Sequence, residues 1–327
     1  MRRLVAVLII LTVLALGWSG AWFWLAGWAD RNAASMLTEI AQRGVEVECR
    51  DRNVVGFPFA MRIACGETAV AERTTGTRAK LGMVTGGASV FAPTTARIDM
   101  ASPAEVDSPH LESPAEIHWR DAALDVGIGL NGPRDVSFDA ADLSVEFALA
   151  DLPDPGLVAA HAAGTLAPSE NGGTDAAVTF TDLTVSADGA SFPPVSGSAS
   201  GHLSVPPRAL LAGRAGLAAP ISAHAIDIAL DSGGARLNAV GDISVDAEGI
   251  LDGAITLRIA GTERLPAFIA ALPPQLQSHG NAVVGALLAF GRPTTIDGEP
   301  ASEVVVEIER SVARIGLFEF RLPRLPL

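Results

Sequence analysis

Apolar and polar residues alternate in short runs along most of this chain, and this two-residue period restricts its fold more than any other feature. Successive side chains of a β-strand point to opposite faces of a sheet, so such runs form strands with one buried face. Gly, Asn, Asp and Ser separate the runs, as turns between hairpin strands require. The sequence therefore predicts a mainly antiparallel sheet from residue 45 onward. Its clearest runs are Leu124-Val126-Ile128-Leu130, Leu143-Val145-Phe147-Leu149, Ile226-Ile228-Leu230, Ile255-Leu257-Ile259 and Val304-Val306-Ile308.

Few segments break this β pattern. Helices are expected at Pro155–Ala163, at Pro206–Leu217 and at Leu265–Phe290, the last broken at Pro273-Pro274. Residues 102–114 hold three prolines and several acidic residues, which predicts a loop. The β-rich domain is therefore expected over residues 45–327, either as one domain or as two subdomains that meet near 102–114.

An uncharged stretch from Leu4 to Ala29 precedes the sheet, and a helix needs only about 20 apolar residues to cross a bilayer. Arg2 and Arg3 favour a cytoplasmic N-terminus by the positive-inside rule, which places everything after Asp30 on the far side. We therefore expect residues 1–29 to be a transmembrane anchor. Indole rings favour the headgroup layer, and four of the five tryptophans lie near the exit end: Trp18, Trp22, Trp24 and Trp28.

The alternative for this segment is a cleaved signal peptide, because Ser19-Gly20-Ala21 is an acceptable small-x-small cleavage site. The apolar run continues past that site and exceeds a typical signal-peptide core, which favours an uncleaved anchor. Residues 30–44 continue with helical spacing up to Gly44 and are predicted to form a juxtamembrane helix, either at the membrane surface or as a solvated stalk.

Cys49 and Cys65 are the two cysteines of the chain, and an even number in an exported chain indicates a disulfide. The alternative is a pair of metal ligands or a redox pair, but their spacing matches neither a CxxC nor a zinc pattern. Between them, Gly56-Phe57-Pro58-Phe59 is predicted to form a structural turn with its two rings beside the disulfide. A ligand contact at this turn is the alternative interpretation.

The N-terminal anchor followed by Cys49, Gly56-Phe57-Pro58-Phe59 and Cys65 resembles a family of alphaproteobacterial envelope proteins known only as a domain of unknown function. Residues 241–253 and the terminal Leu322-Pro323-Arg324-Leu325-Pro326-Leu327 are similar, less specifically, to the strand-rich repeats of AsmA-type proteins. The AsmA-type resemblance implies an inner-membrane anchor that holds an elongated periplasmic sheet, curled into a groove or half-barrel and associated with lipid traffic. No catalytic residue comes with either resemblance.

Two segments resemble enzyme motifs, but each lacks a residue or a neighbouring element that the motif needs. The glycines of Gly127-Ile128-Gly129-Leu130-Asn131-Gly132 match a dinucleotide fingerprint, but another strand-like run follows where a helix is needed, so a hairpin turn is expected. Ala199 occupies the serine position of a nucleophile elbow in Gly197–Gly201, which reads as a small-residue loop. We therefore predict no catalytic, cofactor-binding or metal-ligating residues, no cofactor, and a protein that is not an enzyme.

The net charge and the hydrophobic content exclude two classes of protein. A net charge of −14 excludes a nucleic-acid binder that works by bulk charge, and 49% hydrophobic with only 18% charged residues excludes a disordered acidic chain. The first hypothesis is a bacterial inner-membrane, single-pass protein whose periplasmic sheet binds or conducts phospholipid or another acyl lipid. The second is a non-catalytic scaffold that binds envelope proteins. An open apolar groove would favour the first, and a filled core the second.

Overall fold

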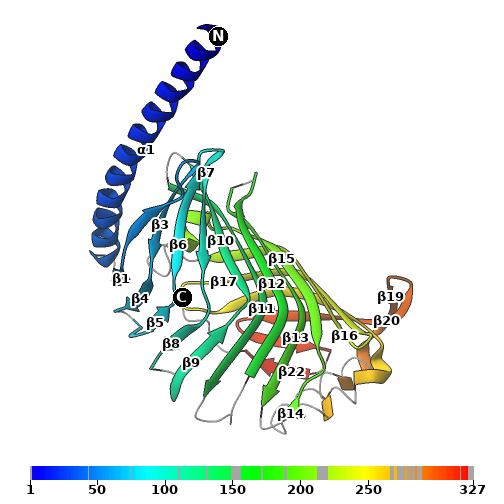
Figure 1. The fold of residues 1–327 in the computed structure, drawn as a ribbon. Helices are drawn as coiled ribbons and strands as arrows, with labels where there is room; N and C mark the ends of the chain where they lie inside the picture. Colours follow the sequence, from blue (N-terminus) through cyan, green and yellow to red (C-terminus); the bar gives the residue numbers. More distant parts are fainter. Residues whose placement is uncertain are drawn as a thin grey trace. The chain divides into compact units, whose positions relative to one another are not determined.

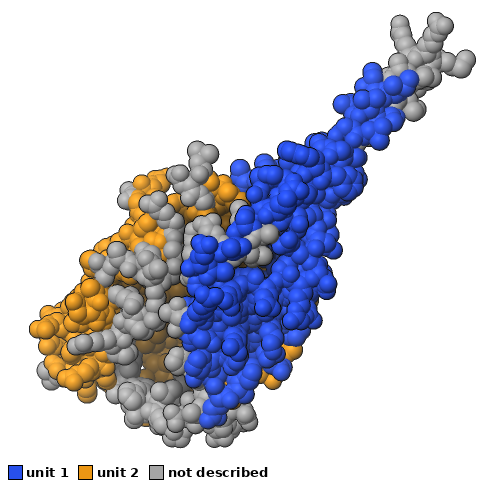
Figure 2. Space-filling model, turned by 90° about the vertical axis from the view of Figure 1, so that its left-hand side faces the viewer, with its two compact units in different colours: residues 1–117 blue, residues 118–327 orange. Residues whose placement is uncertain are grey.

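The computed structural model describes residues 2–42, 44–73, 75–109, 111–129, 132–148, 156–170, 172–187, 190–211, 220–265, 269–270, 277, 281, 284–285, 289–316 and 318–322. The chain divides into two compact units, residues 1–117 and residues 118–327 (Figure 2). The division falls near the end of β9, between Ile117 and His118, a few residues beyond the segment 102–114. Part of that segment, predicted to be a loop, is strand β8.

Unit 1 begins with one long helix, α1 (Arg2–Gln42), so the predicted anchor and juxtamembrane helix are continuous. Within it, Ile9–Asn32 is long and apolar enough to cross a membrane. The nine strands that follow are β1 (Val45–Arg50), β2 (Asn53–Val55), β3 (Ala60–Cys65), β4 (Glu67–Glu72), β5 (Arg78–Leu81), β6 (Val84–Ser89), β7 (Ala92–Met100), β8 (Ala104–Asp107) and β9 (Ser113–His118).

The strands of unit 1 pair in two antiparallel ladders. One has the order β1-β4-β5-β8-β9 and the other has the order β2-β3-β6-β7. The α1 helix lies beside β1 and β2, and its N-terminal half extends past the strands (Figure 1).

Unit 2 is one open antiparallel sheet with a few helical residues. Its long strands follow the order β10-β11-β12-β13-β15-β16-β17-β18-β20, β19 and β21 both pair with β20, and β22 pairs with β21 (Figure 1). Their bounds are β10 (Asp121–Gly129), β11 (Gly132–Ala148), β12 (Gly156–Pro168), β13 (Thr174–Ala187), β14 (Ala190–Ser191), β15 (Val195–Leu203), β16 (Ile221–Ser232), β17 (Ala235–Val245), β18 (Leu251–Ala260), β19 (Arg292–Ile296), β20 (Glu299–Glu309), β21 (Val312–Ile315) and β22 (Phe318–Arg321).

The prediction of a mainly β fold with an N-terminal apolar helix and a large antiparallel sheet is confirmed. The predicted curling of the sheet into a groove or half-barrel needs correction, because the sheet is neither closed nor strongly curled. Closure into a barrel needs the last strand of the sheet to pair with the first. Among the described residues, no pairing joins β20, β21 or β22 to β10. The strands at the two ends of the unit 2 order therefore do not meet, and the sheet of this unit is open.

The predicted helix at Pro155–Ala163 is wrong where the structure describes it, because these residues belong to β12. The segment is rich in alanine, which favours a helix in isolation, yet it pairs on both sides with β11 and β13. Of Pro206–Leu217, Pro207–Leu211 is the helix α2, and residues 212–217 lie outside the described residues. Those residues of Leu265–Phe290 that are described are helical, and Pro273-Pro274 lies outside them.

The C-terminal end of the unit 2 sheet has a filled hydrophobic core. Ile259, Val304, Val306, Ile308 and Ile315 are all less than a tenth exposed and form one cluster. Their partners include Leu257 and Phe320. Alternation along β20 contributes three residues to this core, because Val304, Val306 and Ile308 are buried while the residues that follow each of them are exposed.

Two adjacent valines of β20 test this alternation. Val304 is 5% exposed and Val305 is 47% exposed. We expect Val304→Ala to lower the free energy of unfolding by about 2 kcal/mol, because it removes two buried methyl groups and leaves a cavity. Val305→Ala should lower it by less than about 0.5 kcal/mol. Urea unfolding followed by circular dichroism measures both, and equal losses would contradict the assigned faces.

Candidate functional site

One face of the unit 2 sheet carries an unbroken row of apolar residues across nine strands. Each residue in this row is the direct cross-strand partner of the next. The next row along the sheet, which points to the opposite face, begins with Asp125, Ser137 and Thr165. The apolar row consists of Leu124, Phe138, Gly164, Val178, Ala199, Ile228, Ala239, Leu257 and Val304.

Side-chain size along this row creates a hollow of about 420 Å³ over β11 to β16. The strands in the middle contribute small residues to its floor, chiefly Gly164, Ala199 and Gly201. Larger side chains stand on either side, from Phe138 on β11 to Ile228 on β16. We call this site the apolar hollow; it is lined by Val136, Phe138, Gly164, Thr165, Leu166, Ala176, Ala177, Val178, Ala199, Ser200, Gly201, Leu203, Ala223, Ile226 and Ile228.

Gly164 leaves room for an aromatic ring where β12 forms the floor. A Cβ at this position would overlap the ring of Phe138, its partner on β11. The glycine therefore lets the aromatic ring lie down over the neighbouring strand, where it forms part of the wall.

The apolar hollow remains open, unlike the core at the other end of the same face. Phe138 is 41% exposed and Val178 is 37% exposed, whereas Val304 in the same row is 5% exposed. Large exposed apolar side chains that gather in a concave patch mark sites that bind other molecules. The same row of residues therefore forms a filled core over β18 to β20 and an unfilled site over β11 to β16.

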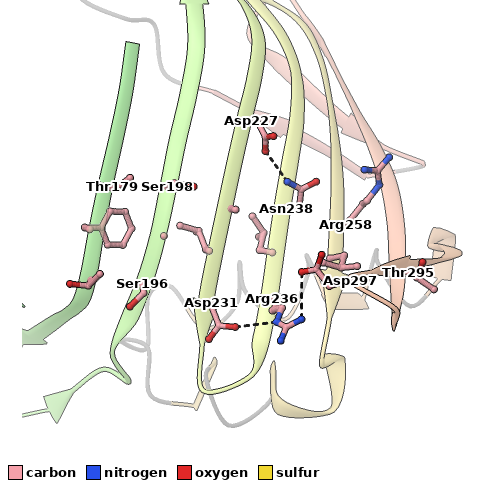
Figure 3. Close-up of a pocket in the computed structure, with 17 residues that line it drawn as sticks. Thr179, Ser196, Ser198, Asp227, Asp231, Arg236, Asn238, Arg258, Thr295 and Asp297 are labelled. Atoms are coloured by element: carbon pink, nitrogen blue, oxygen red, sulfur yellow. Dashed lines mark hydrogen bonds and ion pairs between the residues drawn. The ribbon is translucent and has the colours of Figure 1, made fainter. Parts of the chain in front are cut away.

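A second, polar hollow of about 780 Å³ lies over β13 to β19 (Figure 3). Arg236 reaches Asp231 at 3.3 Å and Asp297 at 3.7 Å, while the amide of Asn238 donates a hydrogen bond to Asp227 at 2.9 Å. Arg258 pairs with Glu303 at 2.8 Å. The charged groups of this hollow thus satisfy one another, as ion pairs that stabilise neighbouring strands do.

Histidines of unit 2 pair in the same way. His161 lies 2.8 Å from a carboxylate oxygen of Asp139, and His202 lies 3.0 Å from one of Asp175, each on the adjacent strand. Within the described part of the chain, no three or more His, Cys, Asp or Glu residues are placed to hold a metal ion.

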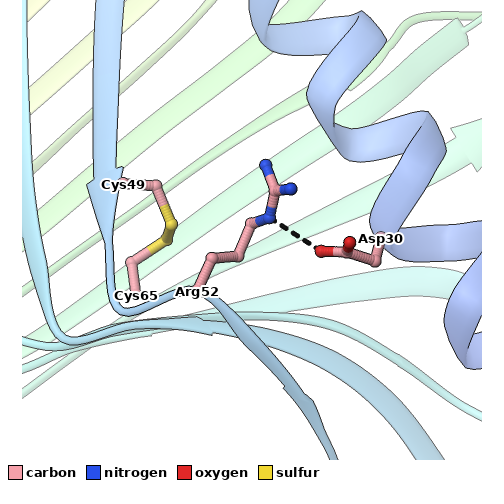
Figure 4. Close-up of a disulfide and its surroundings, with 4 residues drawn as sticks. All are labelled: Asp30, Cys49, Arg52 and Cys65. Carbon is pink, nitrogen blue, oxygen red and sulfur yellow. Dashed lines mark hydrogen bonds and ion pairs between the residues drawn. A yellow bond between two sulfur atoms is a disulfide. The ribbon is translucent and has the colours of Figure 1, made fainter.

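The predicted disulfide between Cys49 and Cys65 is confirmed (Figure 4). Cys49 belongs to β1 and Cys65 to β3, so the bond joins the two ladders of unit 1. Beside it, Arg52 donates a hydrogen bond of 2.7 Å to Asp30 of α1. The disulfide therefore joins the two ladders, and the Arg52–Asp30 hydrogen bond, only a few residues away in the chain, joins α1 to the same region.

Removing this bond should destabilise unit 1. The cysteines are 16 residues apart, and closing a loop of that length stabilises by about 3 kcal/mol in the chain-entropy model. We expect the Cys49→Ala, Cys65→Ala double variant to lose about that much in urea unfolding. Wild-type protein reduced with dithiothreitol is the control and should lose a similar amount. Unchanged unfolding midpoints in both would refute a stabilising role.

The predicted turn residues Gly56, Phe57, Pro58 and Phe59 do form a turn. The amides of Phe59 and Ala60 both donate to the carbonyl of Gly56, which has a positive φ of 104°. The expected position of the rings beside the disulfide needs correction, because they pack on different elements. The reason is that each ring has aromatic partners elsewhere: Phe57 packs against Trp22 and Phe23 of α1, and Phe59 against Phe91.

Two motifs from the sequence find structural explanations. Gly129, the last residue of β10, pairs with Gly132, the first residue of β11, so the predicted hairpin is confirmed. Gly197–Gly201 is part of strand β15, which corrects the predicted small-residue loop. Its small side chains allow close packing, since a Cβ on Gly197 would press against Leu230 and Phe180.

A family model described as "Uncharacterized protein conserved in bacteria (DUF2125)" matches residues 22–319. No curated protein and no solved structure matches the chain. The matched segment begins inside α1 and extends to β22, so it covers both units. This agrees with the predicted resemblance to a family known as a domain of unknown function.

Proposed function

The chain belongs to the DUF2125 family, and from that premise we propose that it is a membrane-anchored, extracytoplasmic protein that binds or conducts an acyl lipid. Its ligand would be a phospholipid or another lipid with a long apolar chain. The anchor would lie in the bacterial inner membrane, with the sheet in the periplasm. We also propose that the chain is related to AsmA-type proteins and that it is of alphaproteobacterial origin.

The apolar hollow is the observation that carries the proposal. Its volume of about 420 Å³ lies within the usual range of small-molecule sites, and its lining offers hardly any hydrogen-bond partner. A polar ligand placed there would lose its hydrogen bonds to water without replacement. An alkyl chain loses nothing and gains about 0.8 kcal/mol for each buried methylene.

The extracytoplasmic location rests on two features of unit 1. An apolar helix long enough to cross a membrane, whether anchor or signal, begins the chain, and a disulfide follows it. Disulfides persist in oxidising compartments and are rare in the cytosol. An anchor would also keep the sheet beside a supply of lipid.

Photocrosslinking in cells tests this function directly. The photoreactive amino acid benzoylphenylalanine would replace Val178 in the apolar hollow or, as the control, its neighbour Thr179 on the opposite face. We expect lipid adducts, identified by mass spectrometry of the purified full chain, at position 178 and not at 179. Protein adducts at 178 without lipid would favour the alternative function, a non-catalytic scaffold for envelope proteins.

A further inference from the structure

The end of unit 1 formed by two turns is hydrophobic and exposed. The turn Phe57–Phe59 precedes β3, and Val90 and Phe91 connect β6 to β7. Phe57 is 49% exposed, Phe59 57% and Phe91 81%. We call these five residues the aromatic tip. No charged residue occurs in Asn53–Met61 or in Leu81–Ala96, the segments that contain it.

Two tryptophans of α1 fix the height of the aromatic tip along the helix. The indole N–H of Trp18 donates to the carbonyl of Pro58 at 3.0 Å, and that of Trp22 donates to the carbonyl of Ala60 at 3.1 Å. Trp22 is 7% exposed and stacks edge-on against Phe57. The tip is therefore held at the level of residues 18–22, and Figure 1 shows the β6–β7 hairpin beside the middle of α1.

That level lies inside the apolar part of the helix. A hydrocarbon core about 30 Å thick takes up roughly 20 helical residues. Within the uncharged run Leu4–Ala29, its outer boundary must then fall between about residue 23 and residue 29. Trp18 lies five to eleven residues inside this boundary, which is roughly 8–17 Å below it.

We propose that the aromatic tip is inserted in the outer leaflet of the bilayer that α1 spans, in contact with lipid acyl chains. This inference rests on the anchor in the proposed function, since a cleaved signal peptide would leave no bilayer beside the tip. Ion pairs begin a few residues outward from it, where Arg62 and Arg97 both pair with Asp99 at 3.5 and 2.8 Å. The pair of Arg52 with Asp30 lies further out, at the exit of the apolar run, where headgroups and water begin.

The backbone of the tip is suited to lipid. Unsatisfied carbonyl and amide groups are costly in hydrocarbon, which excludes ordinary loops from this region. Here the carbonyl of Phe59 accepts from the amide of Val90 at 2.9 Å, and that of Gly56 accepts from two amides of its own turn. The carbonyls of Pro58 and Ala60 are the ones that the two indoles satisfy. Proline at position 58 also removes a donor.

A cleft of about 220 Å³ between α1 and the second ladder supports the same conclusion. Its lining is almost entirely apolar and includes Leu25 on the helix, Met61 on β3 and Pro93 on β7. Exposure of this apolar surface to water is unfavourable, whereas in a leaflet a lipid acyl chain can fill the cleft.

Site-specific fluorescence measures the depth of the tip in the full chain. The described part of the chain has no free cysteine, so a single engineered cysteine can be labelled with the fluorophore NBD while the native disulfide stays oxidised. The test position is Phe91→Cys. Thr75→Cys, exposed in the β4–β5 turn, is the aqueous control, and Leu14→Cys on the apolar helix is the membrane control. Vesicles of phosphatidylethanolamine and phosphatidylglycerol carry doxyl quenchers on their acyl chains.

We expect NBD at position 91 to be quenched by the acyl-chain doxyl groups, and to be quenched by aqueous iodide roughly threefold or more weakly than at position 75. Position 14 should behave like 91. If 14 is quenched by lipid while 91 responds to iodide as 75 does, the insertion of the tip is refuted and the anchor stands. If 14 is also accessible to iodide, the anchor itself is wrong and the inference fails with it.

Discussion

Val178→Glu should reduce acyl-lipid binding about 100-fold or more while the protein remains folded. The substitution places a carboxylate in the middle of the apolar hollow, where Val178 stands between Gly164 and Ala199. An alkyl chain in the hollow would strip water from this charge and offer no hydrogen bond, a loss of at least about 3 kcal/mol. Titration of the full chain in detergent with the fluorescent fatty acid cis-parinaric acid measures the change.

Thr179→Glu is the matched control for this prediction. Thr179 is the next residue of β13 and lines the polar hollow on the other side of the sheet. Its substitution changes the net charge equally, so it should leave binding within about twofold. Circular dichroism must show the same strand content for both variants. Equal binding by wild type and both variants would remove the apolar hollow as the lipid site.

Trp22→Ala should detach α1 from the second ladder of unit 1. Trp22 is 7% exposed, donates a hydrogen bond to Ala60, and packs against Phe57 with ring centroids 5.3 Å apart. Truncating a buried tryptophan to alanine costs about 3–5 kcal/mol. Hydrogen exchange at the amides of Phe59 and Ala60, which bond to Gly56, should accelerate about 100-fold or more.

Trp24→Ala provides the comparison, because Trp24 is 68% exposed on the same helix. Its removal should change exchange in the turn by less than about threefold. The two variants have the same composition, so membrane insertion of α1 is affected equally. Similar exchange rates in both would show that the contact of Trp22 does not hold the turn.

Local signals determined the elements of this protein. Alternation defined most strands because one face of each strand points away from water, as at Val304, Val306 and Ile308. The run Leu4–Ala29 specified a long apolar helix by its length alone. The disulfide followed from cysteine number and compartment, and the turn at Gly56 from glycine and proline chemistry.

Only the tertiary structure decided which residues pack against each face of the strands. The alternation of β13 and that of β20 look alike in sequence, yet Val178 faces an open hollow and Val304 a filled core, because burial depends on what packs over the sheet. The alanine-rich segment in β12 has helical propensity of its own and forms a strand because β11 and β13 pair with it on both sides. The ring of Phe57 packs against Trp22 and Phe23, which lie at least 34 residues away in the chain. The ring of Phe59 packs against Phe91, which lies about as far away. Contacts between such distant residues depend on register and docking, which no local pattern encodes.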